Sequence, residues 1–552
     1  MNVALGVKVA AWIAADPDEE DRAALQALVD HDDELELERR FATPLKFGTA
    51  GLRGPVMAGP SGMNRYTVRR TTQGVIAWLH EIGVDIDNGV VVGRDARRGS
   101  EEFNDEVVNV LLGAGVRVHE LPGPLPTPLV AYGVRALGTA AGIMITASHN
   151  PSRDNGFKLY ANDGAQIIPP SDEIVERHAL AAHTPVLGDR SSPLHQFVTH
   201  DLLDSYQKHF ANRFGVETGS ALNIVYTPLH GVGGDFMAAL FEQAGYTNVS
   251  MVGSQFAPDA AFPTLPFPNP EEVGALDLAM ARADEVKSDL VIANDPDADR
   301  LGVAVRSGRG WHVLRGDEIG WLLASSLFPT MHHVEDVVAT TIVSSTMLRA
   351  MALHYGVRYA QTLTGFKWIS RAAGDGVLRF GYEEALGFSV DPAVADKDGI
   401  SAALAIVHFA HVLSLEGKTL LDRLDEIEAS FGVHATSQLS QRADGPEGGV
   451  AIAASMAALR DRPPSMLGGI EVSEVADLSL GYRGLAATDG VMLVLGAMGR
   501  VVVRPSGTEA KLKAYIEVTS PPLGAATLQR QRENAAEVVS AVRRDLGMIL
   551  SF

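Results

Sequence analysis

Residues 141–151 read Ala-Gly-Ile-Met-Ile-Thr-Ala-Ser-His-Asn-Pro. The apolar run Ala141–Ile145 is typical of a buried strand, and Asn150-Pro151 forces extended or turn geometry directly after it. Ser148 is therefore held at the tip of a rigid element, and Lys158 follows in the same loop region. A serine in this position could act as a nucleophile or as a covalent carrier of phosphate. The alternative is a serine that only hydrogen-bonds its own turn, and this stretch taken alone favours that alternative.

Strand-like and helix-like patterns alternate on both sides of this stretch. Asn64 could cap a helix that runs towards Gly83, and residues 18–40 are acidic and helix-like, as in a surface helix. The alternation restarts near residue 223, again near residue 336, and in a more β-rich form from about residue 431. This pattern predicts an α/β fold with mainly parallel or mixed sheets. We expect four consecutive domains, at 1–210, 211–317, 318–432 and 433–552.

The composition of the 552-residue chain excludes several classes of chemistry. It contains no cysteine, so disulfides, thiolate zinc sites and cysteine nucleophiles are excluded. The net charge of −22 argues against nucleic acid and anionic membranes as partners. A phosphorylated substrate would therefore need a local cluster of Arg and Lys. The first residues lack a basic leader, and the longest apolar run is too short to span a bilayer, so we expect a cytoplasmic enzyme.

A second motif, Asn294-Asp295-Pro296-Asp297-Ala298-Asp299-Arg300, lies between two strand-like runs. Three carboxylates at alternate positions of a tight loop can converge on one hard cation, and oxygen ligands favour Mg²⁺. An EF-hand is excluded, because its sixth position would be Arg300 and its twelfth Arg306. The alternative is a solvated acidic turn, but three Asp so close together repel one another unless a cation lies among them.

A third motif, Arg504-Pro505-Ser506-Gly507-Thr508-Glu509, also lies between strand-like runs and is followed by Lys511 and Lys513. Hydroxyls, backbone amides freed by glycine and an Arg fork can together cradle a phosphate, although a polar hairpin turn explains the same residues. Further candidate loops are Phe47–Gly54, Thr364–Trp368, Gly381–Ala385 and Asp396–Gly399. The turn Leu229–Gly234 is glycine-rich but lacks the lysine of a P-loop, which favours a structural role.

Together these motifs resemble those of the α-D-phosphohexomutase family, the phosphoglucomutases and phosphomannomutases, in order and over nearly the whole chain. The Gly48–Gly54 and Thr364–Lys367 stretches look most like the phosphoglucomutase-2/phosphopentomutase branch and its bacterial relatives. The resemblance implies three α/β domains with mixed sheets and a smaller C-terminal α+β domain around a central cleft.

The resemblance also implies a role for each motif. Ser148 would carry the phosphate, Lys158 and Arg53 would lie beside the transferring group, and Arg300 and His149 would contact the phosphoserine. Mg²⁺ would be held by Asp295, Asp297, Asp299 and the phosphorylated Ser148. The sugar would be bound by Thr364, Gly365, Lys367, Glu383, Glu384 and Lys397, and the second phosphate by Arg504, Ser506, Gly507, Thr508 and Lys513.

The activity implied is phosphoglucomutase, which interconverts glucose 1-phosphate and glucose 6-phosphate with glucose 1,6-bisphosphate as intermediate and activator. Alternatives are phosphomannomutase, phosphopentomutase, a glucose-1,6-bisphosphate synthase and a non-catalytic phosphosugar-binding protein. Many relatives have a serine where this chain has Ala385, and this difference bears on the choice of sugar. The expected partners are a phosphorylated sugar and, at most, a second copy of the chain: a monomer or a homodimer.

Overall fold

The computed structural model describes residues 3–48, 51–217, 219–443, 448–506 and 511–550. The chain divides into two compact units. The first consists of Met1–Val313 with Leu386–His408, and the second of Leu314–Ala385 with Phe409–Phe552. Each unit is described separately below.

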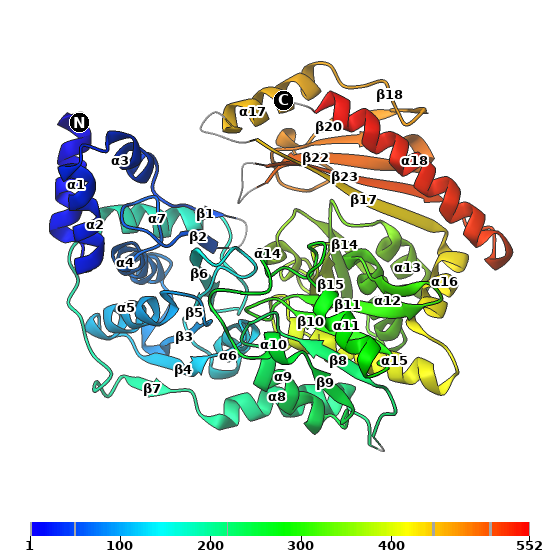
Figure 1. Ribbon diagram of the computed structural model, residues 1–552, viewed down its shortest axis with the longest axis horizontal. Coiled ribbons are helices and arrows are strands. Elements are labelled where there is room, and N and C mark those ends of the chain that lie inside the picture. The colour runs from blue at the N-terminus through cyan, green and yellow to red at the C-terminus, as the bar shows by residue number, and fades with distance from the viewer. Residues whose placement is uncertain (1–2, 49–50, 218, 444–447, 507–510, 551–552) are drawn as a thin grey trace. The chain divides into compact units, whose positions relative to one another are not determined.

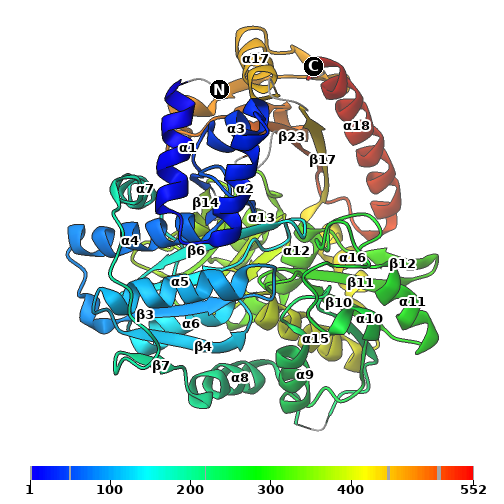
Figure 2. The same ribbon diagram turned by 60° about the vertical axis from the view of Figure 1, so that its left-hand side comes forward.

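The first unit begins with three helices, α1 (Val3–Ala15), α2 (Glu19–Asp30) and α3 (Glu34–Phe41), which lie beside one another in Figure 2. Their apolar faces form one small core from Val9, Trp12, Leu25, Leu37 and Phe41. The single helix expected over residues 18–40 is wrong in one respect: it is two helices. Asp32 adopts a positive φ of 53°, and Asp33 caps the second helix by accepting from the Glu36 N–H.

A seven-stranded mixed sheet follows, in the order β1-β2-β6-β5-β3-β4-β7. Its strands are β1 (Phe47–Gly48), β2 (Gly51–Pro55), β3 (Val90–Arg94), β4 (Val118–Pro124), β5 (Ala141–Ile145), β6 (Asp154–Ala161) and β7 (His195–Phe197). Strand β3 pairs in parallel with β4 and β5, whereas β6 pairs antiparallel with β5 and β2. The predicted strand Ala141–Ile145 is confirmed, and it is buried along its whole length.

Helices cover both faces of this sheet (Figure 1). They are α4 (Arg65–Glu81), α5 (Ser100–Gly113) and α7 (Ser171–Ala181) on one face, and α6 (Pro128–Leu137) with α8 (His200–Phe214) on the other. The sequence predicted α4 with Asn64 as its cap, and the Asn64 side chain accepts from the Thr67 N–H at 2.8 Å. Successive residues of β3 face opposite sides of the sheet, as in any strand. Val90 and Val92 lie in the core under α4 and α5, whereas Gly93 lies against Val130 of α6.

The second sheet of this unit has the order β12-β11-β10-β8-β9. Its strands are β8 (Ile224–Thr227), β9 (Val249–Met251), β10 (Leu290–Asn294), β11 (Leu301–Ser307) and β12 (Gly310–Val313), and its helices are α9 (Gly234–Gln243), α10 (Gly253–Phe256) and α11 (Asp277–Glu285). Strands β10 and β11 are antiparallel, with Asn294 opposite Leu301. The Asp-rich loop is therefore the turn of a hairpin whose two strands are buried.

The chain returns to the first unit at β16 (Gly387–Ser389) and the start of α15 (Gly399–Leu415). Gly387 forms an antiparallel bridge with Arg300, and the Leu301 N–H donates to the Leu386 carbonyl at 3.1 Å. This return brings residues 396–399 next to the Asp-rich loop.

The second unit contains a parallel sheet in which β13 (Asp336–Thr341) lies between β14 (Arg358–Thr362) and β15 (Val377–Glu383). Its helices are α12 (Gly316–Leu327), α13 (Met347–Tyr355), α14 (Phe366–Ile369) and α16 (Leu420–Phe431). Parallel strands joined by helices are the α/β pattern that the sequence predicted here.

The unit ends in an antiparallel sheet of order β17-β23-β22-β21-β20, along which the long helix α18 (Leu528–Ile549) packs in Figure 1. The strands are β17 (Val433–Arg442), β20 (Glu474–Asp477), β21 (Val491–Val494), β22 (Gly499–Pro505) and β23 (Lys511–Ser520), with helix α17 (Gly448–Asp461) and the small hairpin β18 (Met466–Leu467) and β19 (Ile470–Glu471). This is the expected α+β fold at the C-terminus.

The division into four domains, with its three boundaries, stays a prediction. The boundary expected after residue 210 lies inside α8, the one after residue 317 lies inside α12, and the one after residue 432 lies between α16 and β17. Among the described residues no single helix is long and apolar enough to cross a membrane; the bent pair α15 and α16 meets that threshold only jointly, by length and composition.

Candidate active site

Ser148 lies three residues after the end of β5, fully buried, with a positive φ of 55°. This backbone conformation is unfavourable for a residue other than glycine, asparagine or aspartate. The Ser148 N–H donates to Oγ1 of Thr146 at 2.9 Å. The Ser148 hydroxyl donates to Oδ2 of Asp295 at 2.9 Å and lies 3.2 Å from Nδ1 of His149. The strained turn thus aims the hydroxyl at the Asp-rich loop.

Arg97 holds the Ser148 loop from behind, and the sequence motifs did not identify it. Its buried guanidinium donates to the carbonyls of Ser148, Asn150, Pro151 and Asp154. Four backbone acceptors for one side chain fix the path of the loop.

Asp95 in turn holds Arg97. Its carboxylate lies 3.3 Å from Nε of Arg97 and accepts from the hydroxyls of Thr146 and Ser100 at 2.7 and 2.6 Å. Both charged residues directly follow β3, which is parallel to β5. Because the carboxyl ends of parallel strands lie at the same edge of a sheet, this position was a signal for their place beside Ser148.

Arg53 and Lys158 reach the same edge from the antiparallel strands β2 and β6. Arg53 donates to Oδ1 of Asn150 at 3.2 Å. Lys158 pairs with Met144 across the β5–β6 ladder and is fully buried. Its ammonium lies 2.6 Å from Oδ2 of Asp297 and 2.5 Å from Oδ2 of Asp299. Two residues expected beside the reacting group are therefore brought to the loops that carry Ser148 and the three Asp.

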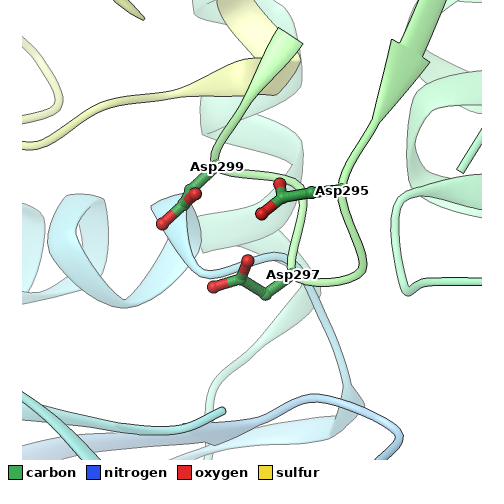
Figure 3. A group of neighbouring side chains, drawn as sticks. All are labelled: Asp295, Asp297 and Asp299. Carbon is green, nitrogen blue, oxygen red and sulfur yellow. The ribbon is translucent and has the colours of Figure 1, made fainter. Parts of the chain in front are cut away.

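The three carboxylates of Asp295, Asp297 and Asp299 face a common space from the β10–β11 turn (Figure 3). All three are buried, and one oxygen atom of each lies within 4.8 Å of the others. Around them, Lys397 contacts Oδ2 of Asp299 at 2.9 Å, and the Arg300 N–H donates to Oδ1 of Asp295 at 2.9 Å. Lys397 was expected at the sugar; here it lies in the first unit as a partner of Asp299.

Burial and the neighbouring carboxylates give the three Asp different acidities. Burial, with the charges of Asp297 and Asp299, raises the pKa of Asp295 well above its usual value. Burial acts in the same direction on Asp297 and Asp299, but neighbouring groups together lower both pKa values: Lys158 and the Thr127 hydroxyl at Asp297, and Lys158, Lys397 and Arg300 at Asp299. Burial, with the charges of Arg300 and Arg53, lowers the pKa of His149 well below its usual value, so its imidazole is neutral at pH 7.

The donor set fits a hard divalent cation. Oδ1 of Asp297 and Oδ1 of Asp299 are buried and have no hydrogen-bond partner among the described residues. A buried carboxylate oxygen without a partner is costly unless a cation satisfies it. Mg²⁺ prefers oxygen ligands about 2.1 Å away, and each of the three carboxylates offers an oxygen atom within 4.8 Å of the others. These residues could hold Mg²⁺.

In the second unit the structure joins the two predicted sugar loops. The Gly365 N–H donates to Oε1 of Glu383 at 2.7 Å, and Gly365 adopts a φ of 114°, which a side chain would disfavour. Thr364 and Lys367 belong to the same turn. Glu384 accepts from Oγ of Ser344 at 2.6 Å. Glu383 therefore orders the Thr364–Lys367 turn.

The C-terminal loop is described in part. Gly507 and Thr508 lie outside the described residues. Arg504 and Lys513 are directly opposite each other on β22 and β23, and the Ser506 N–H donates to the Lys511 carbonyl at 2.8 Å. Two cations on directly opposite residues of a sheet repel each other, and an anion between them removes the repulsion. This arrangement suits a phosphate.

Comparisons with known proteins identify the family to which the chain belongs. Models of the phosphoglucomutase/phosphomannomutase family match four stretches of the chain in order: α/β/α domain I at 44–184, α/β/α domain II at 204–308, α/β/α domain III at 315–431 and the C-terminal domain at 470–534.

Several curated proteins are similar over most of their length. A "Probable phosphomannomutase" of Haemophilus influenzae is 39% identical, covering 83% of this chain and 93% of that protein. A phosphopentomutase of Mus musculus is 34% identical, covering 98% and 94%. A phosphoglucomutase of Staphylococcus aureus strain MRSA252 is 33% identical, covering 91% and 95%.

Solved structures share the fold. A phosphoglucomutase/phosphomannomutase family protein from Burkholderia thailandensis gives a TM-score of 0.68 at 19% identity, covering 90% of this chain and 97% of that one. Parafusin, a phosphoglucomutase from Paramecium, gives a TM-score of 0.68 at 18% identity, covering 92% of this chain and 96% of that one.

The family models and the curated relatives together show that the chain is an isomerase that belongs to the phosphoglucomutase/phosphomannomutase family of phosphohexomutases.

Proposed function

We propose that this enzyme moves a phosphoryl group between Ser148 and a sugar monophosphate. The observation that carries this proposal is the 2.9 Å hydrogen bond between the Ser148 hydroxyl and Asp295, beside two ion pairs of Lys158. A serine with a solely structural role in its turn would not need to face three carboxylates and a lysine in a buried site. Phosphoryl transfer depends on charge neutralisation and alignment, and this site offers both.

The reaction proceeds in two transfers. In the first, a sugar hydroxyl attacks the phosphorus of phosphorylated Ser148; the bond from phosphorus to Oγ breaks, and the sugar becomes a 1,6-bisphosphate. Lys158 is the proposed proton carrier: it donates a proton to Oγ as that oxygen departs and takes up the proton that the sugar hydroxyl releases. In the second transfer, Oγ attacks the other phosphate and the bond from its phosphorus to the sugar oxygen breaks. The Oγ proton passes by way of Lys158 to that sugar oxygen, which regenerates phosphorylated Ser148 and leaves the isomeric monophosphate.

Several groups of this chain stabilise the transferring phosphoryl group. Arg53 and Arg300 are proposed to bind its oxygens as charged donors, and Arg97 keeps Ser148 in line by fixing its loop. Asp295, Asp297 and Asp299 would hold Mg²⁺, which, when bound, offsets the charge on the transferring group. The neutral imidazole of His149 is positioned beside Oγ.

The remaining candidate residues are proposed to bind the sugar and its second phosphate. The proposed sugar contacts are Thr364, Gly365, Lys367, Glu383, Glu384 and Lys397. Arg504, Ser506, Gly507, Thr508 and Lys513 are the proposed contacts of the phosphate that is not reacting. Because each half-reaction presents a different phosphate to Ser148, this second phosphate site must accept both ends of the sugar.

Glucose is the proposed sugar, with glucose 1,6-bisphosphate as intermediate and activator. A pentose phosphate is the second candidate, supported by the phosphopentomutase relative that covers 98% of the chain and by Ala385, which offers no hydroxyl to a hexose. Mannose 1-phosphate is a third.

Purified enzyme should be assayed with glucose, mannose, ribose and deoxyribose 1-phosphates. The concentration of Mg²⁺ and that of a bisphosphate activator should be the same for every substrate. We expect the largest kcat/KM for glucose 1-phosphate. A larger value for ribose or deoxyribose 1-phosphate would replace glucose by the pentose. Accumulation of bisphosphate from an added phosphoryl donor, without isomerised monophosphate, would instead indicate a bisphosphate synthase.

A further inference from the structure

The glycine-rich turn between β8 and α9 has an unusual backbone. Leu229 and His230 are consecutive residues with positive φ, at 48° and 62°. Leucine rarely adopts this conformation, histidine adopts it more often, and two such residues in succession are rarer still. Strain of this kind persists only where the surroundings enforce it, and it gathers at functional sites. The turn lacks the lysine of a phosphate-binding loop, so its strain calls for another explanation.

His230 is held on three sides. Its N–H donates to the Gln255 carbonyl at 2.9 Å, and its own carbonyl accepts from the Asp259 N–H at 3.0 Å. Nε2 of its imidazole lies 2.8 Å from Oγ1 of Thr264. The side chain of His230 is buried, as is that of Leu229. These contacts come from the segment 255–264, which thus enforces the strained conformation.

Gly231 and Val232, the two residues after His230, pack against the Asp-rich loop. The Val232 N–H donates to the Pro296 carbonyl at 2.8 Å. A Cβ atom added to Gly231 would lie 2.3 Å from Cα of Pro296 and 2.4 Å from its carbonyl oxygen. These neighbours are backbone atoms and cannot turn aside as a side chain could. Pro296 lies between Asp295 and Asp297 in the sequence, so its position determines where their carboxylates lie.

We propose that the turn Leu229–Val232 is a positioning element that sets the spacing of Asp295, Asp297 and Asp299 and thereby the affinity of the site for Mg²⁺. This inference rests on the proposed metal role of the three Asp. Mg²⁺ demands near-ideal octahedral geometry at short distances, whereas Ca²⁺ accepts longer and more variable ones. A displaced Pro296 should therefore weaken the binding of Mg²⁺ more than that of Ca²⁺.

The test is calorimetric titration of the metal-free, full-length enzyme with Mg²⁺ and, separately, with Ca²⁺. The variant is Gly231→Ala, and the matched control is Gly253→Ala in the same part of the unit, where an added Cβ would meet no atom within 4 Å. We expect Gly231→Ala to raise the Kd for Mg²⁺ about tenfold or more, as changes behind metal ligands commonly do. The Kd for Ca²⁺ should rise less, and the control should bind both ions as the wild type does.

A second variant guards against misfolding. Thr264→Val keeps the shape of the residue but removes the hydroxyl that meets the His230 imidazole, and it should weaken Mg²⁺ binding in the same direction. Circular dichroism and thermal unfolding in EDTA compare the folds without metal. Wild-type Mg²⁺ affinity in both folded variants would overturn the positioning role alone. Failure of the wild type to bind Mg²⁺ would overturn the metal site itself, and with it this inference.

Discussion

The hydroxyl of Ser148 donates to Oδ2 of Asp295 across 2.9 Å, although the two residues lie in loops that follow strands of different sheets of the first unit. Ser148 follows a strand of the first sheet, and Asp295 begins the hairpin turn of the second. The hydrogen bond occupies one oxygen of a carboxylate whose other oxygen accepts from the Arg300 N–H. Ser148 and the proposed metal ligands therefore lie in one site.

Replacement of Asp295 by Asn should abolish most of the activity. The change removes one negative charge from the proposed Mg²⁺ site and weakens the alignment of Ser148, so we expect kcat to fall by about 100-fold or more. Steady-state assays over a range of Mg²⁺ concentrations measure the effect. Asp87→Asn, at an exposed position of the same unit, is the control and should behave as the wild type. The metal role would be contradicted if Asp295→Asn were as active as Asp87→Asn, and if neither variant were less active in EDTA than in Mg²⁺.

Arg97→Lys should lower kcat with little change in KM. A lysine cannot reach four carbonyl oxygens at once, so the Ser148 loop would lose its fixed path, and a misplacement of about 1 Å can cost about 100-fold in rate. Arg98→Lys changes the exposed neighbour and should leave both constants unaltered. A rise in KM with kcat unchanged would show that Arg97 acts on substrate binding instead.

Arg504→Gln should act in the opposite way, chiefly on KM. The lost hydrogen bonds to a charged phosphate are worth about 1.5–3 kcal/mol, which corresponds to about a 10- to 150-fold rise in KM. The exposed Arg462→Gln provides the matched loss of charge in the same unit. If the two variants have the same KM for the sugar phosphate, Arg504 does not bind its distal phosphate.

Asp317 should make the unfolding free energy of the second unit depend on pH. Burial raises its pKa to about 6 from 3.8, while its carboxylate accepts from the Ser345 N–H and the Tyr382 hydroxyl. Between these two pKa values the folded state binds more protons than the unfolded state. The contribution of Asp317 to the free energy of unfolding is therefore greatest at low pH and is lost as pH rises through 6. The difference amounts to about 3 kcal/mol.

Denaturant unfolding of the wild type and of Asp317→Asn at pH 4 and pH 8 measures this dependence. The variant should gain about 2.5 kcal/mol relative to the wild type between the two pH values, because pH 4 lies just above the unfolded pKa. The exposed Asp375→Asn should show no such gain. A pH-independent difference between wild type and Asp317→Asn would contradict the raised pKa.

The sequence predicted those parts of the fold that depend on neighbouring residues. The run Ala141–Ile145 is apolar enough to be a buried strand in any arrangement, and Asn64 precedes a helical pattern whose first N–H groups need a cap. The break between α2 and α3 was missed because residues 31–33 are as polar as the helices around them, and polarity alone does not mark a turn.

Contacts between distant segments could not be read from the sequence. Arg97 follows a different strand from Ser148, and its four carbonyl partners become visible only when β3 and β5 pair. The glycines of the Leu229–Gly234 turn are visible in the sequence, but the contact of this turn with Pro296 depends on how two loops of one sheet meet. The sequence motifs therefore named the residues that could touch the substrate and missed those that hold them in place.

The proposed mechanism is tested most directly by measuring the phosphorylation of Ser148 itself. The enzyme should be incubated with glucose 1,6-bisphosphate and Mg²⁺, and the modified residue located and quantified by mass spectrometry alongside the mutase assay. We expect phosphate on Ser148 in the wild type, and loss of both the phosphate and nearly all turnover in Ser148→Ala. Full turnover by Ser148→Ala, or phosphate on another residue of an active enzyme, would contradict it.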